Sequence, residues 1–244
     1  MLLLHAAAVF TSAALLFLVQ PMAGKMLLPS FGGAPAVWTT SLVFYQAVLL
    51  LGYLGAHLAA TRLTPRAQAL AYWGALLLAI ASLPVAPPPG AGTDPAASPV
   101  LAVLAALART VGLPFVALSA SGPLLQGWFA RSPHRAARDP YFLYAVSNFG
   151  SMLALLAYPS LVEPHLGLSA QSHAWSWGFV ALAALALGCG ALQLRHPPGP
   201  EARAHDSCGL GAGPRLLWLG QALLPSSLLM GVTLYLTTDR RAHV

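Results

Sequence analysis

Long apolar stretches separated by short connections are the feature that most restricts how this chain can fold. Hydrophobic residues make up 57% of the 244 residues, and charged residues make up only 7%. A soluble domain carries roughly 25% charged residues, so an ordinary soluble fold is excluded. A helix needs about 20 mainly apolar residues to cross a bilayer, because lipid cannot satisfy exposed backbone groups. The sequence therefore predicts an all-α integral membrane protein, a polytopic helical bundle.

Seven stretches are long and apolar enough to be expected as transmembrane helices. They are Leu2–Leu28, Ala36–Ala60, Ala67–Ala86, Pro99–Phe129, Pro140–Leu161, Ser169–Leu194 and Leu216–Leu236. The first six predict a membrane bundle over 1–194, followed by a cytoplasmic connecting loop at 195–215. The seventh helix and a short tail occupy 216–244.

Arginines in the connections indicate how the helices are oriented. The connections after the second, fourth and sixth stretches carry Arg62 and Arg66; Arg131, Arg135 and Arg138; and Arg195, Arg203 and Arg215. The connections after the first, third and fifth carry no lysine or arginine. Since basic residues accumulate on the cytoplasmic side, the N-terminus is expected in the cytoplasm. We interpret the formal charge of +6 as a consequence of this topology and expect no nucleic-acid partner.

Polar side chains recur at helical spacing in two of the stretches. One set is Thr39, Gln46, Tyr53 and His57, and the other is Tyr144, Asn148, Ser151 and Tyr158. Residues at such spacing share one face of a helix. The two faces are expected either to line a substrate path or to hold helices together by hydrogen bonds.

Two basic residues lie inside predicted spans, where charges are costly and often functional. Lys25 has either a substrate or coupling role, or an interfacial position that its long side chain can reach. Pro21 would have to kink the helix for Lys25 to share a face with Gln20. Arg109 requires a partner from another helix or a cavity, unless the helix places it near the outer surface.

The connection before the fifth stretch contains three arginines and a capping signal. Asp139 and Pro140 are suited to the start of a helix. The alternative is that Arg131, Arg135 and Arg138 bind anionic lipid headgroups or a soluble partner. No catalytic motif, metal-ligand spacing or cofactor site is predicted anywhere in the chain.

Several strings resemble the membrane half of bacterial proteins in which a major-facilitator-like domain is fused to a spermidine-synthase-like domain. They include FLVQPMAGKMLLP (17–29), RDPYFLYAVSNFGSMLALLAYP (138–159) and PSSLLMGVTLYLTTD (225–239). The strings at 35–58 and 112–130 belong to the same resemblance, which extends from about residue 10 to Asp239. It implies a bacterial inner-membrane protein whose second half and catalytic domain are missing from this chain.

The resemblance also implies a role in moving, sensing or presenting a polyamine-related metabolite. The candidates for a substrate path are Gln20, Lys25, Trp38, Gln46, Arg109, Tyr144 and Asn148. Two other functions stay open, namely a membrane anchor for a separately encoded aminopropyltransferase and a fragment without function. The expected partners are the lipid bilayer and either a soluble synthase-like domain or a second copy of the chain.

Overall fold

The computed structural model describes residues 1–92, 98–195 and 212–239, and these residues form helices and no strands. The chain divides into two compact units, Met1–Pro198 and Gly199–Val244. The second unit contains one described helix, α10 (Ala212–Asp239), which covers the seventh predicted span. Most of the connecting loop predicted at 195–215 lies outside the described residues.

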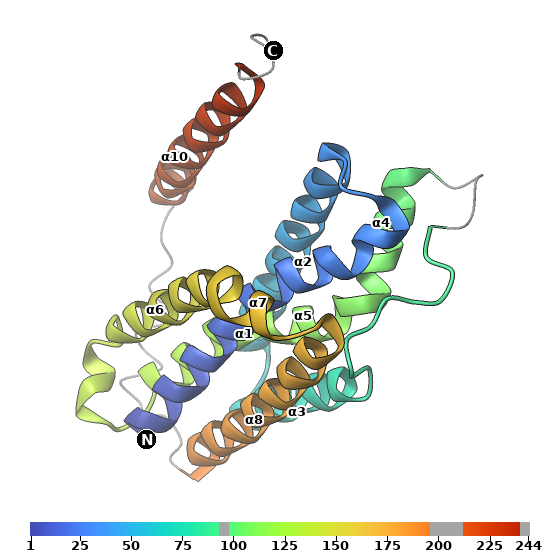
Figure 1. Cartoon of the computed structure of the whole chain (residues 1–244). Coiled ribbons are helices and arrows are strands. Elements are labelled where there is room, and N and C mark those ends of the chain that lie inside the picture. Colours follow the sequence, from blue (N-terminus) through green and yellow to red (C-terminus); the bar gives the residue numbers. More distant parts are fainter. Residues whose placement is uncertain (93–97, 196–211, 240–244) are drawn as a thin grey trace. The chain divides into compact units, whose positions relative to one another are not determined.

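Five helical runs in the first unit are long and apolar enough to cross a membrane (Figure 1). They are α1 (Leu2–Phe31), α2 (Pro35–Arg62), the run of α4 (Pro99–Leu107), η1 (Ala108–Gly112) and α5 (Leu113–Ala130), the run of α6 (Phe142–Ala157), η3 (Tyr158–Val162) and α7 (Glu163–His165), and α8 (Leu168–Arg195). These runs confirm the helices predicted for the first, second, fourth, fifth and sixth stretches. A short 3₁₀ turn, η2 (Arg135–Arg138), precedes α6.

The third predicted span is wrong in its length. Helix α3 (Pro65–Ile80) has 16 residues and is not among the helices long enough to cross a membrane. At about 1.5 Å per residue it extends roughly 24 Å. The apolar pattern continues to Ala86, but Pro84 disfavours helical geometry at the preceding residue. The chain therefore leaves the helix through a turn at residues 81–82.

Two π-helical turns interrupt the long helices beside prolines. Turn η1 (Ala108–Gly112) lies just before Pro114, and turn η3 (Tyr158–Val162) contains Pro159. Proline lacks an N–H and its ring crowds the preceding turn, so the backbone widens there while the chain stays helical. The run from Pro99 to Ala130 therefore stays continuous, with a wide turn just before Pro114.

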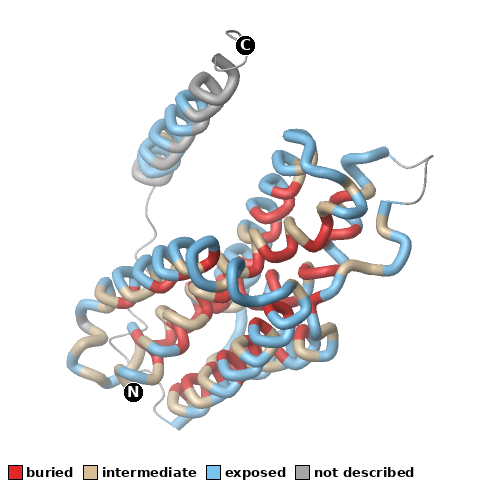
Figure 2. Tube along the Cα trace, viewed as in Figure 1, coloured by how far each residue is buried: buried red, intermediate tan, exposed pale blue. Residues whose placement is uncertain are grey.

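Helix α1 is the centre of the bundle and packs on α5, α6 and α8, while α2 packs mainly on α5. Buried residues follow the inward faces of these helices (Figure 2). Glycines permit close approaches between them. A Cβ added at Gly150 would lie 2.8 Å from the Phe10 carbonyl oxygen, and one at Gly190 would lie 2.7 Å from the Trp73 ring. Close backbone contact through small residues is typical of helix association in lipid.

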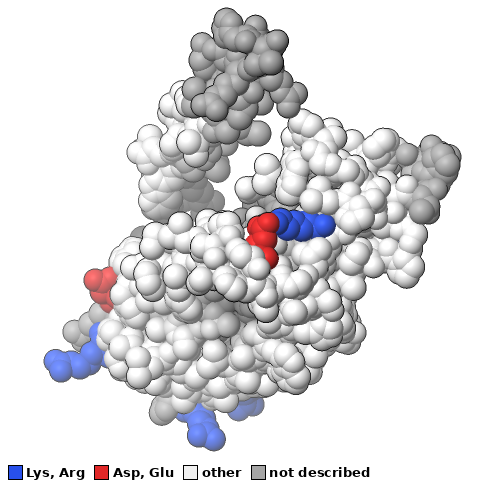
Figure 3. Space-filling model, in the orientation of Figure 1, with Lys and Arg blue, Asp and Glu red and all other residues white. Residues whose placement is uncertain are grey.

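The outward surface of the first unit is strongly apolar. Leu50, Leu101 and Trp177 have exposed fractions of 69%, 64% and 73%, and many other leucines are exposed. Charged side chains occupy only a few places on the face seen in Figure 3. Exposing such a surface to water is unfavourable, whereas contact with lipid hydrocarbon carries no such cost. The composition and the surface together support a membrane-embedded protein.

In the first unit, the helix ends next to Arg62, Arg66, Arg131 and Arg195 lie at one end of the bundle, here called the arginine end. There the Gln68 side-chain oxygen accepts hydrogen bonds from Trp128 Nε1 at 3.3 Å and from Arg131 Nη2 at 3.1 Å. Met1, Arg131 and Gln193 line one small cavity at this end. The predicted clustering of arginine-bearing connections therefore agrees with the packing.

Candidate functional site

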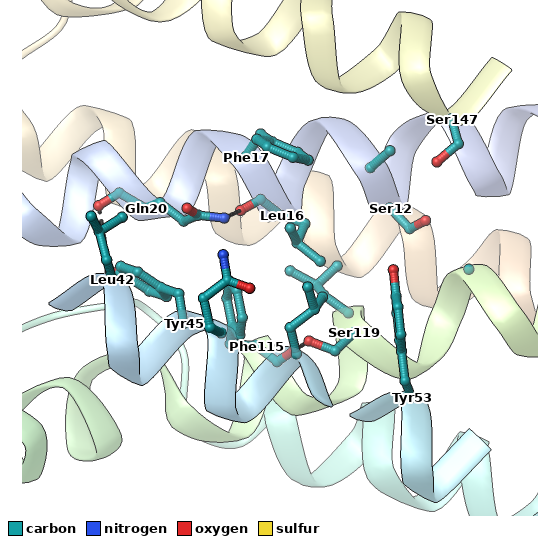
Figure 4. Close-up of a pocket in the computed structure, with 15 residues that line it drawn as sticks. Ser12, Leu16, Phe17, Gln20, Leu42, Tyr45, Tyr53, Phe115, Ser119 and Ser147 are labelled. Carbon is teal, nitrogen blue, oxygen red and sulfur yellow. Dashed lines mark hydrogen bonds between the residues drawn. The ribbon is translucent and has the colours of Figure 1, made fainter. Parts of the chain in front are cut away.

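A pocket of about 200 Å³ lies between α1, α2 and α5, with one residue contributed by α6 (Figure 4). Its polar lining residues are Ser12, Gln20, Tyr45, Gln46, Tyr53, Ser119 and Ser147. Its other lining residues are Ala13, Leu16, Phe17, Leu42, Leu49, Phe115, Leu118 and Gly122. The pocket is partly open, since Leu42, Gln46 and Tyr53 in its lining are exposed. A concave site that combines apolar walls with a few polar groups is the usual form of a small-molecule site.

The pocket forms because α1 and α2 both pack on α5 and touch each other little. Tyr45 bridges the gap at one level, since its hydroxyl donates to the Gln20 carbonyl oxygen at 3.4 Å. Its ring lies against Phe115, with 5.0 Å between the ring centroids. Figure 4 shows Gln20 on α1 facing Tyr45 on α2. This contact positions two helices around the cavity without filling it.

Two of the predicted substrate-path residues line this pocket, Gln20 and Gln46. Tyr53, from the same predicted polar face as Gln46, also lines it. The remaining members of that face lie elsewhere, since Thr39 is exposed with its hydroxyl donating to Pro35 at 3.0 Å. His57 is exposed near the arginine end of α2.

The polar face predicted on α6 is turned away from the pocket at its first two positions. Tyr144 and Asn148 are exposed, whereas Ser147 lines the cavity. The face of α6 that packs inward contains Gly150, whose missing side chain lets α6 approach α1. The close packing of α6 against α1 at Gly150 therefore determines which face of α6 is directed inward, and the spacing of its polar residues does not.

Trp38 lies outside the pocket near the opposite end of the bundle from the arginines. It is 42% exposed. Its ring covers Gly24, where an added Cβ would lie 2.9 Å from the ring. The structure thus shows Trp38 as a packing residue between α2 and α1, beside Lys25.

Lys25 forms an ion pair with Glu163, the first residue of α7. The lysine nitrogen also lies 5.9 Å from the centre of the Tyr158 ring. Sequence reasoning missed Glu163 because the fifth span was expected to end at Leu161. The helix instead continues through the π turn η3, which brings the carboxylate to α1.

We expect Lys25→Met and Glu163→Gln to change the free energy of unfolding by less than about 1 kcal/mol each, as is typical of partly exposed ion pairs. The two side chains are 31% and 42% exposed, so water already screens much of their attraction. Thermal unfolding of the two single variants and the double variant in detergent would measure this. A loss of several kcal/mol in either single variant would contradict it.

Arg109 is exposed on the π turn η1. The Tyr45 contacts place Phe115 and Gln20 at one level of the bundle. Arg109 precedes Phe115 by six residues and Lys25 follows Gln20 by five. At about 1.5 Å per residue, both lie roughly 7–9 Å from that level towards the same end. Arg109 is therefore an exposed side chain at about the same height in the bundle as Lys25.

The three arginines before α6 do not form a single exposed cluster in the described part of the chain. Arg131 is partly buried and donates to Gln68, while Arg135 is exposed. The side chain of Arg138 lies outside the described residues. Asp139 Oδ1 accepts from the Tyr141 N–H at 3.4 Å, so the capping signal acts one turn before α6 begins.

Among the described residues, no group of three or more His, Cys, Asp or Glu side chains could hold a metal ion. The polar pocket residues that the sequence does not predict are Ser12, Tyr45, Ser119 and Ser147, because their convergence depends on how the helices pack. Comparisons of the chain with protein-family models, with curated proteins and with solved structures find no match.

Proposed function

We propose that this protein is a membrane-embedded, transporter-like helical domain that binds a small amphipathic solute in the pocket between α1, α2 and α5. The observation that carries the proposal is a pocket with polar groups and aromatic rings inside a bundle whose outside is apolar. Hydrogen-bonding groups in such a place are costly unless they serve packing or a ligand. Gln46 is an exposed residue of this lining, on a helix that makes few contacts with α1.

The proposed solute class is a polyamine-related metabolite, and the proposed location is a bacterial inner membrane with the N-terminus in the cytoplasm. The resemblance of 17–29 and 138–159 to the membrane half of spermidine-synthase-fused proteins supports the solute class. The arginine end supports the orientation, because basic residues favour the cytoplasmic side. In this proposal Gln20 and Gln46 contact the solute, while Tyr144 and Asn148 do not.

Uptake into vesicles tests the proposal. Vesicles containing the full chain are expected to accumulate labelled spermidine, and Gln46→Ala is expected to reduce uptake roughly 10-fold, the effect of losing about one hydrogen bond. Asn148→Ala is the matched control, since this amide is exposed away from the pocket, and it is expected to leave uptake unchanged.

Absence of uptake by the unsubstituted protein, with the protein shown to be folded and inserted, would overturn the transport role. Equal loss of uptake in Gln46→Ala and Asn148→Ala would overturn the assignment of the pocket as the path.

A further inference from the structure

Four of the polar residues that line the pocket already donate a hydrogen to a backbone carbonyl. Ser12 Oγ donates to the Val9 carbonyl at 3.0 Å, and Ser119 Oγ donates to the Phe115 carbonyl at 2.7 Å. A hydroxyl has a single hydrogen to donate, so both oxygens can offer only lone pairs to a ligand. Ser12 and Ser119 can therefore only accept hydrogen bonds from a ligand, so they favour a ligand that carries N–H or O–H donors.

Tyr45 and Gln20 follow the same pattern. The Tyr45 hydroxyl donates to the Gln20 carbonyl oxygen at 3.4 Å, and Gln20 Nε2 donates to the Leu16 carbonyl oxygen at 3.3 Å. The tyrosine oxygen is left as an acceptor, and the Gln20 amide keeps its oxygen and one N–H. Gln46, Tyr53 and Ser147 can act as donor or acceptor. All seven polar lining residues keep an oxygen that can accept, whereas only Gln20, Gln46, Tyr53 and Ser147 keep a hydrogen to donate, so the lining favours hydrogen-bond acceptors.

Two prolines add backbone acceptors at the same pocket. Pro21 lies inside α1 and Pro123 lies inside α5. In a regular helix, the N–H of a residue donates to the carbonyl oxygen four residues earlier. Proline has no N–H, so the Phe17 carbonyl loses this partner at Pro21, and the Ser119 carbonyl loses it at Pro123. Both Phe17 and Ser119 line the pocket. Their carbonyl oxygens lack the amide partner of a regular helix and can accept from a ligand.

The lining has no negative charge, since no acidic side chain is among the described residues that form the pocket. Neutral oxygens and aromatic rings can replace the water around a single ammonium group. The volume of about 200 Å³ suits a small molecule, because a cavity of about 150 Å³ holds benzene. A multiply charged chain would place its further charges outside the cavity.

We infer that the pocket between α1, α2 and α5 selects a protonated primary amine with a short apolar body, held by its N–H donors. This inference rests on the proposed function and narrows its solute to one ammonium group per site. The serine and tyrosine oxygens and the two proline-released carbonyls accept from the ammonium, and the body contacts Phe17 and Phe115.

Binding of two isomeric cations to the full chain in lipid nanodiscs tests the inference. Equilibrium dialysis at constant ionic strength would compare labelled pentylammonium with ethyltrimethylammonium, which has the same atoms and charge but no N–H. Pentylammonium is expected to bind at least about 10-fold more tightly. Sodium ions and 1-pentanol, added as competitors, are expected to displace it poorly.

Pro123→Ala is the decisive variant, because it supplies the amide that pairs the Ser119 carbonyl. We expect it to weaken pentylammonium binding about 3-fold to 10-fold, while the melting temperature without ligand stays the same or rises, since a helix-interior proline is removed. Pro29→Ala is the matched control. It adds the same N–H to α1 at a position that does not line the pocket, so binding is expected to stay unchanged.

Four results would overturn the inference. Equal or tighter binding of ethyltrimethylammonium would show that aromatic faces and charge select the ligand, and would leave the pocket as the solute site. Efficient displacement of pentylammonium by 1-pentanol or by sodium would also overturn selection by N–H donors. It would leave the pocket as the solute site. Unchanged binding in Pro123→Ala would remove the role of the released carbonyl. Absence of binding by every probe would overturn both this inference and the pocket's part in the proposed function.

Discussion

Gly52→Ala is expected to lower the free energy of unfolding by about 1–3 kcal/mol, as overpacking of a tight interface does. A Cβ at Gly52 would lie 2.3 Å from Ser119 Cβ and 3.1 Å from the Ala120 backbone nitrogen. These atoms belong to α5 itself, so relief requires α2 and α5 to separate. Because Ser119 also lines the pocket, solute binding is expected to weaken in the same variant.

Gly55→Ala is the matched control for this prediction. It lies on the same helix, and a Cβ there would meet no atom within 4 Å. Since alanine is favoured over glycine in a helix by up to about 1 kcal/mol, Gly55→Ala is expected to be neutral or stabilising. Thermal unfolding of both variants in the same detergent provides the measurement. Similar melting temperatures for the two would contradict the close contact between α2 and α5.

Gln68→Leu is expected to destabilise the protein by roughly 1–3 kcal/mol, because it leaves buried donors without their acceptor. Gln68 is only 2% exposed. Its oxygen accepts from Trp128 and Arg131, and its nitrogen donates to the Leu63 carbonyl at 3.0 Å. One amide thus joins the connection between α2 and α3 to the end of α5, and leucine can make none of these bonds.

The same substitution at Gln126 provides a comparison, since that side chain is only half-buried on α5. Gln126→Leu is expected to change stability by less than about 0.5 kcal/mol, as substitutions away from buried networks do. Denaturation followed by circular dichroism at the helix signal would measure both variants. A Gln68→Leu protein as stable as Gln126→Leu would show that the network contributes little.

The polar spacing in the sequence predicted part of the candidate site. Gln46 and Tyr53 were expected on one face of a helix, and both line the pocket. Gln20, which the sequence analysis names as a substrate-path candidate, lines the pocket as well. Helical periodicity is a local property, so it assigns such residues to a shared face without reference to the rest of the fold.

The rotation of α6 shows where that reasoning stops. Tyr144 and Asn148 satisfy the helical spacing as well as the α2 residues do, yet neither lines the pocket. Gly150 decides the inward face, because α1 packs directly against its backbone. In a bundle surrounded by lipid, apolar outward faces carry no penalty, so polarity alone does not identify the inner face.

The length of α3 and the partner of Lys25 depend on prolines in different ways. Pro84 ends the helical run that hydropathy extends to Ala86. Pro159 does not end its helix, because a π turn accommodates it and carries Glu163 to Lys25. Hydropathy describes how apolar a segment is. It does not show whether a proline in that segment ends the helix or is accommodated within it.

The sequence by itself determined that this protein is a helical bundle with apolar helices, and it indicated which connections carry the positive charge. Composition and hydropathy suffice for that, because backbone groups in an apolar environment must be paired within helices. Only the tertiary structure decided which polar residues meet. The gap between α1 and α2, and the convergence of Gln20, Tyr45 and Ser119 on it, follow from close contacts at glycines that any one helix, taken alone, leaves undetermined.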